Sequence, residues 1–254
     1  MQVTFLGTGT SVGVPRIGCD CTVCISDNPR NNRLRCAILI VHEDRNILVD
    51  TPPDYRTQAL LYDIRRLDAV VFTHAHADHL HGLDDVRTYC LNRDEGLPCY
   101  ADLITVERIK RVFDYALNSP WPHVPKLNLH TIDGPFELFG LPVQPLTVMH
   151  GKLPVQAFRI GTFAYVTDCS VIPDDTMAAL EGVDTLVLDA LRHREHPTHL
   201  NVEQALEVVE SLKPRQTYLT HIAHDLEHEA TNASLPDGVE LAYDGLTLDL
   251  PTLS

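Results

Sequence analysis

An α/β fold is predicted by two features of the sequence. Short runs rich in β-branched and other apolar residues, typical of buried strands, recur along the whole chain, as in 68–73. Between several of them lie segments whose apolar residues recur at helical spacing, as in 54–66. Polar residues that can bind metal ions follow several of the strands. Because strands from both halves supply residues to one candidate site, we expect a single domain over residues 1–254.

The expected elements follow in chain order. The strand at 2–6 leads into a glycine-rich stretch, 7–13, which lacks the following helix and the Lys-Ser/Thr of a P-loop and is interpreted as a tight turn. Residues 36–42 and 46–50 are expected to form a hairpin, and 238–248 another with an Asp-Gly turn. Further strands are expected at 68–73, near 98–100, and at 126–131, 141–149, 155–160, 162–167, 183–189 and 216–220, and helices at 54–66, 80–92, 103–117 and 201–212.

The motif Thr-His-Ala-His-Ala-Asp-His at 73–79 carries the clearest chemical signal. Its histidines and aspartate cannot share one helical face, because residues two apart on a helix point in different directions. A loop at a strand end can instead direct His74 and His76 to one ion, and Asp78 and His79 to a neighbouring ion. Imidazole and carboxylate ligands suit divalent Zn, Mn or Fe. Two such ions activate water for attack on phosphorus or carbon.

Further ligand candidates end other strands. His150 and Asp168 each close a strand, and a carboxylate in that position can bridge two metal ions. His221, directly after the strand at 216–220, would complete the second metal. Asp50 is placed either to orient a metal-bound histidine or to cap a turn, and its position favours neither reading.

Three histidines, His193, His196 and His199, lie in the loop after the strand at 183–189. A histidine at such a strand end could serve as a general acid for a leaving group. The residues alone do not decide which of the three has this role.

A second motif, C-x-C-x-x-C, is formed by Cys19, Cys21 and Cys24. It supplies three thiolates, one fewer than the closed tetrahedral set of a structural zinc site. Unrelated thiols and a redox pair are the alternatives. His224, three residues after His221, is the candidate for the fourth ligand. Because a fully ligated ion has no open position, we expect a structural role for this site.

Composition restricts the partners. The net charge of −15, from 20 basic and 35 acidic residues, argues against a protein that binds extended nucleic acid. A small anionic substrate remains compatible, because bound metal ions set the sign of the field inside a site. No apolar stretch approaches the roughly 20 residues that span a bilayer, and the N-terminus lacks a signal-peptide pattern. We therefore expect a cytoplasmic protein that does not contact membranes.

The motif at 73–79, followed by His150, Asp168 and His221, resembles the metallo-β-lactamase superfamily of hydrolases over essentially the whole chain. The resemblance implies a four-layer αββα sandwich, with two sheets back to back and a dinuclear metal site at one edge. It implies that one ion is held by His74, His76 and His150, the other by Asp78, His79 and His221, and that Asp168 bridges them.

Within the superfamily, Gly-Val-Pro at 13–15, G-C-D-C-x-x-C at 18–24, H-G-K-L at 150–153 and T-H-I-A-H at 220–224 resemble the PhnP family, phosphodiesterases of the carbon–phosphorus lyase pathway of phosphonate metabolism. The resemblance implies that a hydroxide bridging two ions hydrolyses 5-phosphoribosyl 1,2-cyclic phosphate to ribose 1,5-bisphosphate. It suggests a homodimer as well. The implied site contains two Mn²⁺ (or Zn²⁺), His199 as the catalytic acid, Asp78 as both ligand and catalytic residue, and a structural Zn²⁺ on Cys19, Cys21, Cys24 and His224.

Other branches of the superfamily share the core motif. Coenzyme-biosynthesis proteins of the pyrroloquinoline quinone type also carry a C-x-C-x-x-C loop and are non-hydrolytic or oxidative alternatives. A tRNA 3′-processing nuclease is a further alternative, but the chain lacks a basic insertion for gripping tRNA. Nothing in the sequence distinguishes a cyclic ribose phosphate from a cyclic nucleotide or another small diester.

Overall fold

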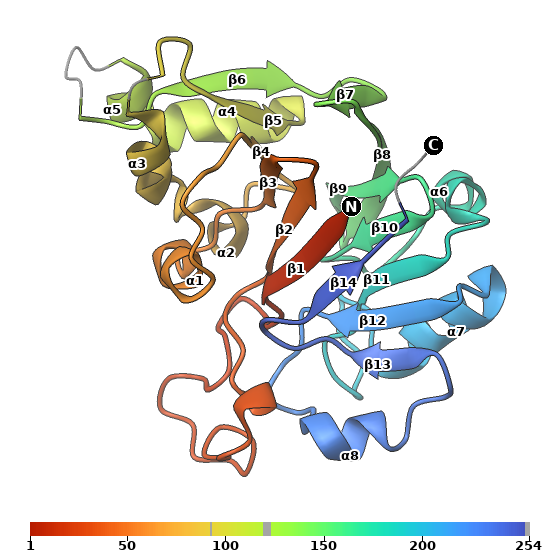
Figure 1. Cartoon of the computed structure of the whole chain (residues 1–254). Coiled ribbons are helices and arrows are strands. Elements are labelled where there is room, and N and C mark those ends of the chain that lie inside the picture. Colours follow the sequence, from red (N-terminus) through yellow and green to blue (C-terminus); the bar gives the residue numbers. More distant parts are fainter. Residues whose placement is uncertain (92, 119–122, 252–254) are drawn as a thin grey trace.

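Two seven-stranded sheets face each other in the computed structural model, which describes residues 1–91, 93–118 and 123–251 (Figure 1). The first sheet has the order β14 (Thr247–Asp249), β1 (Gln2–Gly7), β2 (Ala37–His42), β3 (Arg45–Val49), β4 (Ala69–Val71), β5 (Leu97–Ala101) and β6 (Leu127–Thr131). The second has the order β13 (Val239–Leu241), β12 (Gln216–Thr220), β11 (Thr185–Asp189), β10 (Phe163–Val166), β9 (Leu153–Ile160), β8 (Leu141–His150) and β7 (Phe136–Leu138).

Helices cover the outer faces of both sheets. The apolar core outside the first sheet includes Tyr55, Leu80 and Ile109, and the core outside the second includes Leu180 and Ala205. The helices are α1 (Tyr55–Leu61), α2 (Ala77–Leu80), η2 (Leu83–Val86), α3 (Arg87–Cys90), α4 (Leu103–Val112) and α5 (Asp114–Leu117) in the first half, and α6 (Asp174–Leu180), α7 (Val202–Leu212) and α8 (His228–Asn232) in the second, with the short η1 (Pro29–Asn31) near the N-terminus.

The central strands β2 and β4 of the first sheet are apolar on both faces because each face is covered. Ile38 and Ile40 of β2 pack between the sheets with Phe158 of β9, whereas Ala37 and Leu39 pack under the helices. This alternation follows from the two-residue period of a strand. Helix, sheet, sheet and helix layers confirm the predicted αββα sandwich.

The topology gathers strand ends at one edge. Strands β10, β11 and β12 run parallel to one another, as do β3 and β4 in the first sheet. Parallel strands place their carboxyl ends at the same edge, where ligands bind in open α/β sheets. The side chains that follow these ends, including Asp50, Asp168 and His221, are therefore brought together from distant parts of the chain.

The predicted strands agree with the structure to within two residues at either end, but three predicted helices are wrong in extent. The helix at 54–66 ends at Leu61, two residues before Asp63 adopts a left-handed backbone with φ of 50°. The segment 80–92 breaks into short helices, because the backbone N–H of Gly82 donates to the carbonyl oxygen of Thr51 at 2.9 Å and so leaves the helical pattern. Gly82 also packs so closely on Pro52 that a Cβ would lie 2.0 Å from its carbonyl oxygen; residue 92 itself lies outside the described residues. The helix at 103–117 is interrupted at Phe113.

The predicted hairpin at 238–248 is also wrong. Strand β13 pairs with β12 in the second sheet, whereas β14 pairs with β1 in the first. The Asp-Gly turn joins the two sheets because the Asp244 carboxylate accepts hydrogen bonds from the backbone N–H of Thr8, at 2.9 Å, and of Leu34, at 2.6 Å. A tertiary contact thus overrides a local turn signal. The short elements η1, β7, α6 and α8 were not predicted, and residues 77–80, which were expected to belong to a loop except for residue 80, form the short helix α2.

A buried arginine fixes the base of the N-terminal loop that carries the cysteines. Arg33 is 2% exposed, and its Nη1 donates to Thr8 Oγ1 at 3.1 Å and to the carbonyl oxygen of Ala242 at 2.6 Å. Its Nη2 donates to Nδ1 of His228 at 3.1 Å. Because a guanidinium can only donate, His228 Nδ1 must be unprotonated in the folded chain.

This arrangement predicts acid sensitivity. Burial and the neighbouring Arg33 lower the pKa of His228 to about 4, whereas the unfolded chain protonates it near its ordinary value of about 6.5. Between these two pKa values the unfolded state binds more protons than the folded state. The stability that neutral His228 contributes is therefore lost as the pH falls from about 6.5 to about 4. In His228→Gln, whose amide oxygen accepts from Arg33 but does not titrate, thermal unfolding at about pH 5 and about pH 7.5 should show a smaller acid-induced decrease. An equal decrease in both proteins would refute this assignment.

Candidate metal centre and active site

Three side chains of the site follow strand ends in a strained backbone conformation. Asp50, Asp168 and His221 have φ angles of 66°, 51° and 58°, a left-handed region that residues with a Cβ rarely adopt. Such strain persists where the surrounding structure enforces it, and it concentrates at functional sites. Each residue thereby turns its side chain away from the course of its strand.

Asp168 lies at the centre of the cluster. Its Oδ1 is 3.1 Å from Nε2 of His221 and 3.2 Å from Nε2 of His79, and its Oδ2 is 3.6 Å from Nε2 of His74. Asp78 Oδ2 completes one group, at 3.5 Å from His79 Nε2 and 3.7 Å from His221 Nε2. The Asp168 carboxylate therefore belongs both to a group with Asp78, His79 and His221 and to a group with His74 and His76.

The donor atoms of this cluster fit divalent metal ions. Nε2 of His74, His79 and His221 is buried in each case, and none of the three has a hydrogen-bond partner among the described residues. Buried polar atoms are nearly always paired, so converging orphan nitrogens around a shared carboxylate indicate a ligand set. Imidazole and carboxylate suit Zn or Mn. Two groups share Asp168, as the predicted ligand sets do, but His150 falls in a third group with Asp168 and His199 rather than with His74 and His76; ligation itself stays a prediction.

His150 and His76 lie on the outer side of this cluster. Their ring centroids are 5.1 Å apart, and His76 is exposed. His150 Nδ1 is 2.6 Å from the carbonyl oxygen of Thr198 and therefore donates to it, which leaves Nε2 free as a ligand atom. His150 groups more closely with Asp168 and His199 than with His74.

Asp50 orients one of the histidines. Its Oδ2 is 2.7 Å from His79 Nδ1, and its carboxylate accepts from the backbone N–H and the hydroxyl of Thr73, both at 2.8 Å. Of the two readings left open by the sequence, the histidine-orienting one matches this geometry. The contact fixes Nδ1–H as the donor and leaves Nε2 of His79 facing Asp168.

Charges in the cluster compensate one another. Burial alone would lower the pKa of His79, but Asp168, Asp50 and Asp78 raise it well above its ordinary value. Burial acts against the charge of Asp168 as well, yet His221 and His79 hold the pKa of its carboxyl well below the usual range. The carboxylates thus create a place for positive charge inside a buried site, which divalent ions would occupy after displacing protons.

A histidine–aspartate pair borders the cluster. Asp189, at the end of β11, is fully buried, and its Oδ2 accepts from His199 Nδ1 at 3.1 Å and from the backbone N–H of Cys169 at 3.2 Å. The His199 ring stacks on His221 with centroids 4.6 Å apart. Of the three histidines in this loop, His199 therefore reaches the centre, His196 lies beside it at 5.1 Å between ring centroids, and His193 is exposed.

Sequence reasoning assigned no role to Asp189. The signal was present, because Asp189 ends a buried strand as Asp50 and Asp168 do. Its partner His199 lies ten residues on, at the end of an irregular loop. No spacing rule connects the two residues.

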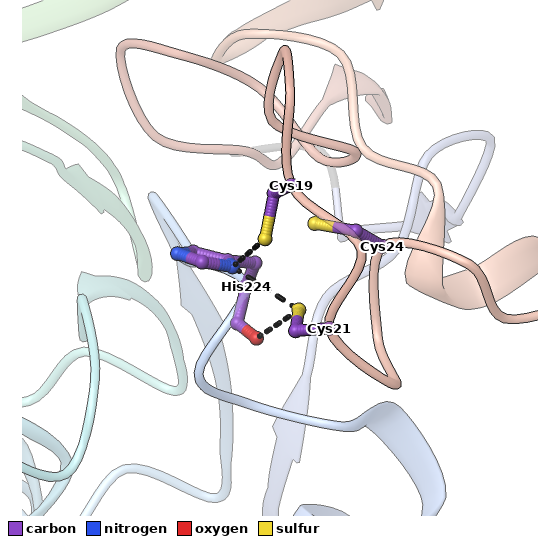
Figure 2. A group of neighbouring side chains, drawn as sticks. All are labelled: Cys19, Cys21, Cys24 and His224. Carbon is purple, nitrogen blue, oxygen red and sulfur yellow. Dashed lines mark hydrogen bonds between the residues drawn. The ribbon is translucent and has the colours of Figure 1, made fainter.

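The cysteine loop forms a separate cluster with His224 (Figure 2). Nδ1 of His224 lies 3.4 Å from Cys19 Sγ and 3.3 Å from Cys21 Sγ. Hydrogen bonds from the backbone of Cys24 and from His224 lower the pKa of Cys21 to about 6, which favours the thiolate that zinc requires. The backbone N–H of Arg16 donates to Cys24 Sγ at 3.4 Å. Four soft or borderline ligands with no open position fit a structural zinc.

We expect Cys21→Ser to lose about one zinc per chain and to lower the unfolding temperature. Elemental analysis and calorimetry measure the two effects, with the exposed Ser11→Ala as a control in the same loop. The loop is tied to the segment after His221, because Thr10 N–H donates to the Ile222 carbonyl at 3.1 Å. Retention of zinc in Cys21→Ser would exclude the assignment.

Comparison with known proteins is consistent with this geometry. Residues 45–222 match the Beta-lactamase superfamily domain. The structure superposes on that of a diphosphatase from the PhnP family with a TM-score of 0.92 and 45% identity, over 97% of this chain and 96% of that one. An octanoyltransferase of Porphyromonas gingivalis is 38% identical over 97% of this chain, which spans only 51% of that protein. Coenzyme PQQ synthesis protein B of Methylorubrum populi is 25% identical over 74% of this chain and 72% of its own length.

The described residues contain no helix that is both long enough and apolar enough to cross a membrane.

Proposed function

This chain belongs to the PhnP family within the metallo-β-lactamase superfamily, and we propose that it is a metal-dependent phosphodiesterase that hydrolyses a small cyclic phosphate. The observation that carries the proposal is the pairing of two features at one sheet edge. Asp168 joins two groups of ligand residues, and a buried carboxylate holds His199 beside them. Hydrolysis of a phosphodiester uses bound metal ions and a general acid, because charge builds on the phosphoryl oxygens while the leaving oxygen takes up a proton.

The candidate metal ligands form two sets that share the Asp168 carboxylate. His74, His76 and His150 would hold one divalent ion, Asp78, His79 and His221 the other, and Asp168 would contact both. Ions held there lower the pKa of water and neutralise the charge of the phosphoryl group. We propose two Mn²⁺ or Zn²⁺ ions in this centre and one structural Zn²⁺ in the cysteine loop.

His199 is proposed as the general acid. Asp189 accepts the hydrogen of its Nδ1, so Nε2 carries the second proton when the ring is charged. A nitrogen of His199 lies within 4.8 Å of ligand atoms of both His150 and Asp168. A phosphodiester bound at the centre would therefore lie beside His199, and proton transfer from its Nε2 would release the sugar hydroxyl.

The proposed substrate is 5-phosphoribosyl 1,2-cyclic phosphate, and its product would be ribose 1,5-bisphosphate. When a cyclic phosphodiester is opened, the leaving hydroxyl stays attached to the product. A compact site that holds one small molecule is therefore sufficient for the reaction. We propose a cytoplasmic location, in keeping with a small phosphorylated metabolite as the substrate. The acidic composition supports a small substrate rather than extended nucleic acid.

Acyl transfer is a second candidate, because one relative is named an octanoyltransferase. A cysteine nucleophile requires an accessible thiolate. Cys21 has a lowered pKa, but it and the other loop cysteines are proposed as ligands of the structural zinc. The cysteines outside the loop are buried, and burial raises the pKa of Cys36 to about 12 and that of Cys169 well above its ordinary value. Non-hydrolytic coenzyme biosynthesis of the pyrroloquinoline quinone type is a third candidate, and it leaves the His199–Asp189 pair without a role.

A substrate panel separates these candidates. Manganese-loaded protein would be offered cyclic phosphates, linear phosphodiesters, a phosphomonoester, an octanoyl thioester and a β-lactam. We expect selective turnover of cyclic phosphates. Turnover of the thioester alone would support acyl transfer instead. If no substrate is turned over although the metal sites are filled, the coenzyme-biosynthesis alternative is favoured.

A further inference from the structure

One hydroxyl group joins ligand candidates of the two proposed ions. Thr73 lies two residues after the end of β4 and is 1% exposed. Its Oγ1 lies 2.8 Å from Oδ2 of Asp50 and 3.0 Å from Nδ1 of His74. The same Asp50 oxygen lies 2.7 Å from Nδ1 of His79. Because His74 and His79 belong to different groups of ligand residues, the Thr73 hydroxyl connects the two groups through Asp50.

The direction of these hydrogen bonds follows from the number of hydrogens available. An ionised carboxylate can only accept, so the single hydrogen of the Thr73 hydroxyl lies between its Oγ1 and Asp50 Oδ2. Thr73 Oγ1 can then only accept from His74, whose Nδ1 must carry the hydrogen of that contact. A histidine binds metal as the neutral ring, so the free lone pair of His74 is on Nε2. This Nε2 is the buried atom that has no hydrogen-bond partner among the described residues.

Backbone contacts fix the chain around this hydroxyl. Strands β3 and β4 are parallel neighbours, and the backbone N–H of Asp50 donates to the carbonyl oxygen of Val71 at 2.9 Å. The backbone N–H of Thr73 donates to Oδ1 of Asp50 at 2.8 Å. The carbonyl oxygen of Thr73 accepts from the backbone N–H of Gln156, in β9 of the second sheet, at 2.9 Å. Thr73 is therefore held to both sheets, which gives its hydroxyl a defined position.

We propose that Thr73 is a positioning residue of the metal centre, whose hydroxyl relays the orienting effect of the Asp50 carboxylate to His74. This inference rests on the dinuclear centre of the proposed function. Asp50 would orient His79, a ligand candidate of one ion, directly, and His74, a ligand candidate of the other ion, through the hydroxyl. A partner on the second ring nitrogen fixes the tautomer of a ligand histidine, and its loss typically costs about 10–100-fold in metal affinity. One buried carboxylate would thus contribute to the affinity of both ions.

The test compares two replacements of Thr73. Thr73→Val removes the hydroxyl and keeps the branched shape, whereas Thr73→Ser keeps the hydroxyl. Mn²⁺ is titrated into protein whose cysteine loop retains zinc, because thiolates favour zinc over manganese, and EPR of the free Mn²⁺ gives the affinity of each binding step. Thr73→Val should weaken one step about 10–100-fold and leave the other nearly unchanged. Thr73→Ser should bind both ions nearly as tightly as the parent does.

Thr217→Val is the matched control. Thr217 is a fully buried threonine of β12, and its Oγ1 has no hydrogen-bond partner within the described part of the chain, so this variant should bind both ions as the parent does. A thermal scan checks folding; if Thr73→Val is unfolded, Thr73→Ala removes the same hydroxyl without placing a methyl group against the carboxylate. Parent-like affinities in Thr73→Val, equal weakening of both steps, or the same loss in Thr217→Val would each overturn the relay.

A double-mutant cycle tests whether Thr73 acts through Asp50. Asp50→Asn should weaken both binding steps, and adding Thr73→Val to it should cause little further loss. Fully additive losses would show that Thr73 acts independently of Asp50, which would overturn the relay, as would a parent protein that binds fewer than two Mn²⁺ ions. These affinities do not depend on turnover. If the parent binds two ions but hydrolyses no cyclic phosphate, the proposed function fails, and the affinities still decide whether the relay exists.

Discussion

Replacing Asp168 by asparagine should empty the metal centre and lower turnover by roughly 10⁴-fold or more. The Asp168 carboxylate lies close to ligand atoms of both sets, at 3.1 Å from His221 Nε2 and 3.6 Å from His74 Nε2. Asparagine keeps the shape but removes the charge, so His79 and His221 lose the partner that compensates a buried positive charge. Elemental analysis of the purified variant and its turnover of a cyclic phosphate measure the effect.

Either replacement removes one partner of a buried charge cluster, which costs about 3–5 kcal/mol of stability. Alanine would leave a cavity in addition, so asparagine is the better choice for keeping the variant folded. A thermal scan checks that the variant is folded. Asp133→Asn, at an exposed carboxylate, serves as the control and should retain the full metal content. Two ions retained in Asp168→Asn would show that Asp168 does not bridge the centre.

Replacing His199 by alanine should lower turnover of the cyclic phosphate by roughly 10²–10⁴-fold while the metal content stays unchanged. His199 contacts Asp189 through Nδ1 and stacks on His221, so its other nitrogen is the group that can deliver a proton. Asp189→Asn should weaken turnover less, because the histidine remains but loses the carboxylate that orients it.

The choice of leaving group makes this prediction specific. An aryl phosphodiester departs without help from an acid, so the deficit of His199→Ala should shrink markedly on such a substrate. If His199 is the general acid, the His199→Ala variant should also lose one limb of the pH–rate profile. If His199→Ala loses a metal ion instead, His199 is a ligand, a role that its proximity to His150 and Asp168 would permit.

Much of the site could be predicted from the sequence because its chemistry is local. His74, His76, Asp78 and His79 fall in one short segment, and Asp168 and His221 each follow a recognisable strand. A strand that ends in a ligand residue can be recognised in the sequence without knowledge of the tertiary structure. The assembly of these strand ends at one edge then follows from parallel pairing, which the alternation of strands and helices suggests.

The features that escaped prediction depend on contacts between distant segments. The Asp-Gly turn at 244–245 has the local signal of a hairpin, yet Thr8 and Leu34 determine its course by donating to Asp244. The helix predicted at 80–92 is broken where Gly82 meets Pro52. In both cases a partner more than twenty residues away outweighs the intrinsic preference of the segment, which spacing and propensity cannot register.

The proposed function depends most directly on attack of water at phosphorus in a cyclic phosphodiester. Manganese-loaded protein would be incubated with 5-phosphoribosyl 1,2-cyclic phosphate in ¹⁸O-labelled water, and the products followed by ³¹P NMR. We expect the cyclic resonance to be replaced by a monoester resonance that carries the isotope shift of one ¹⁸O atom on phosphorus. Persistence of the cyclic resonance with filled metal sites, or ¹⁸O incorporated at the sugar carbon instead, would contradict it.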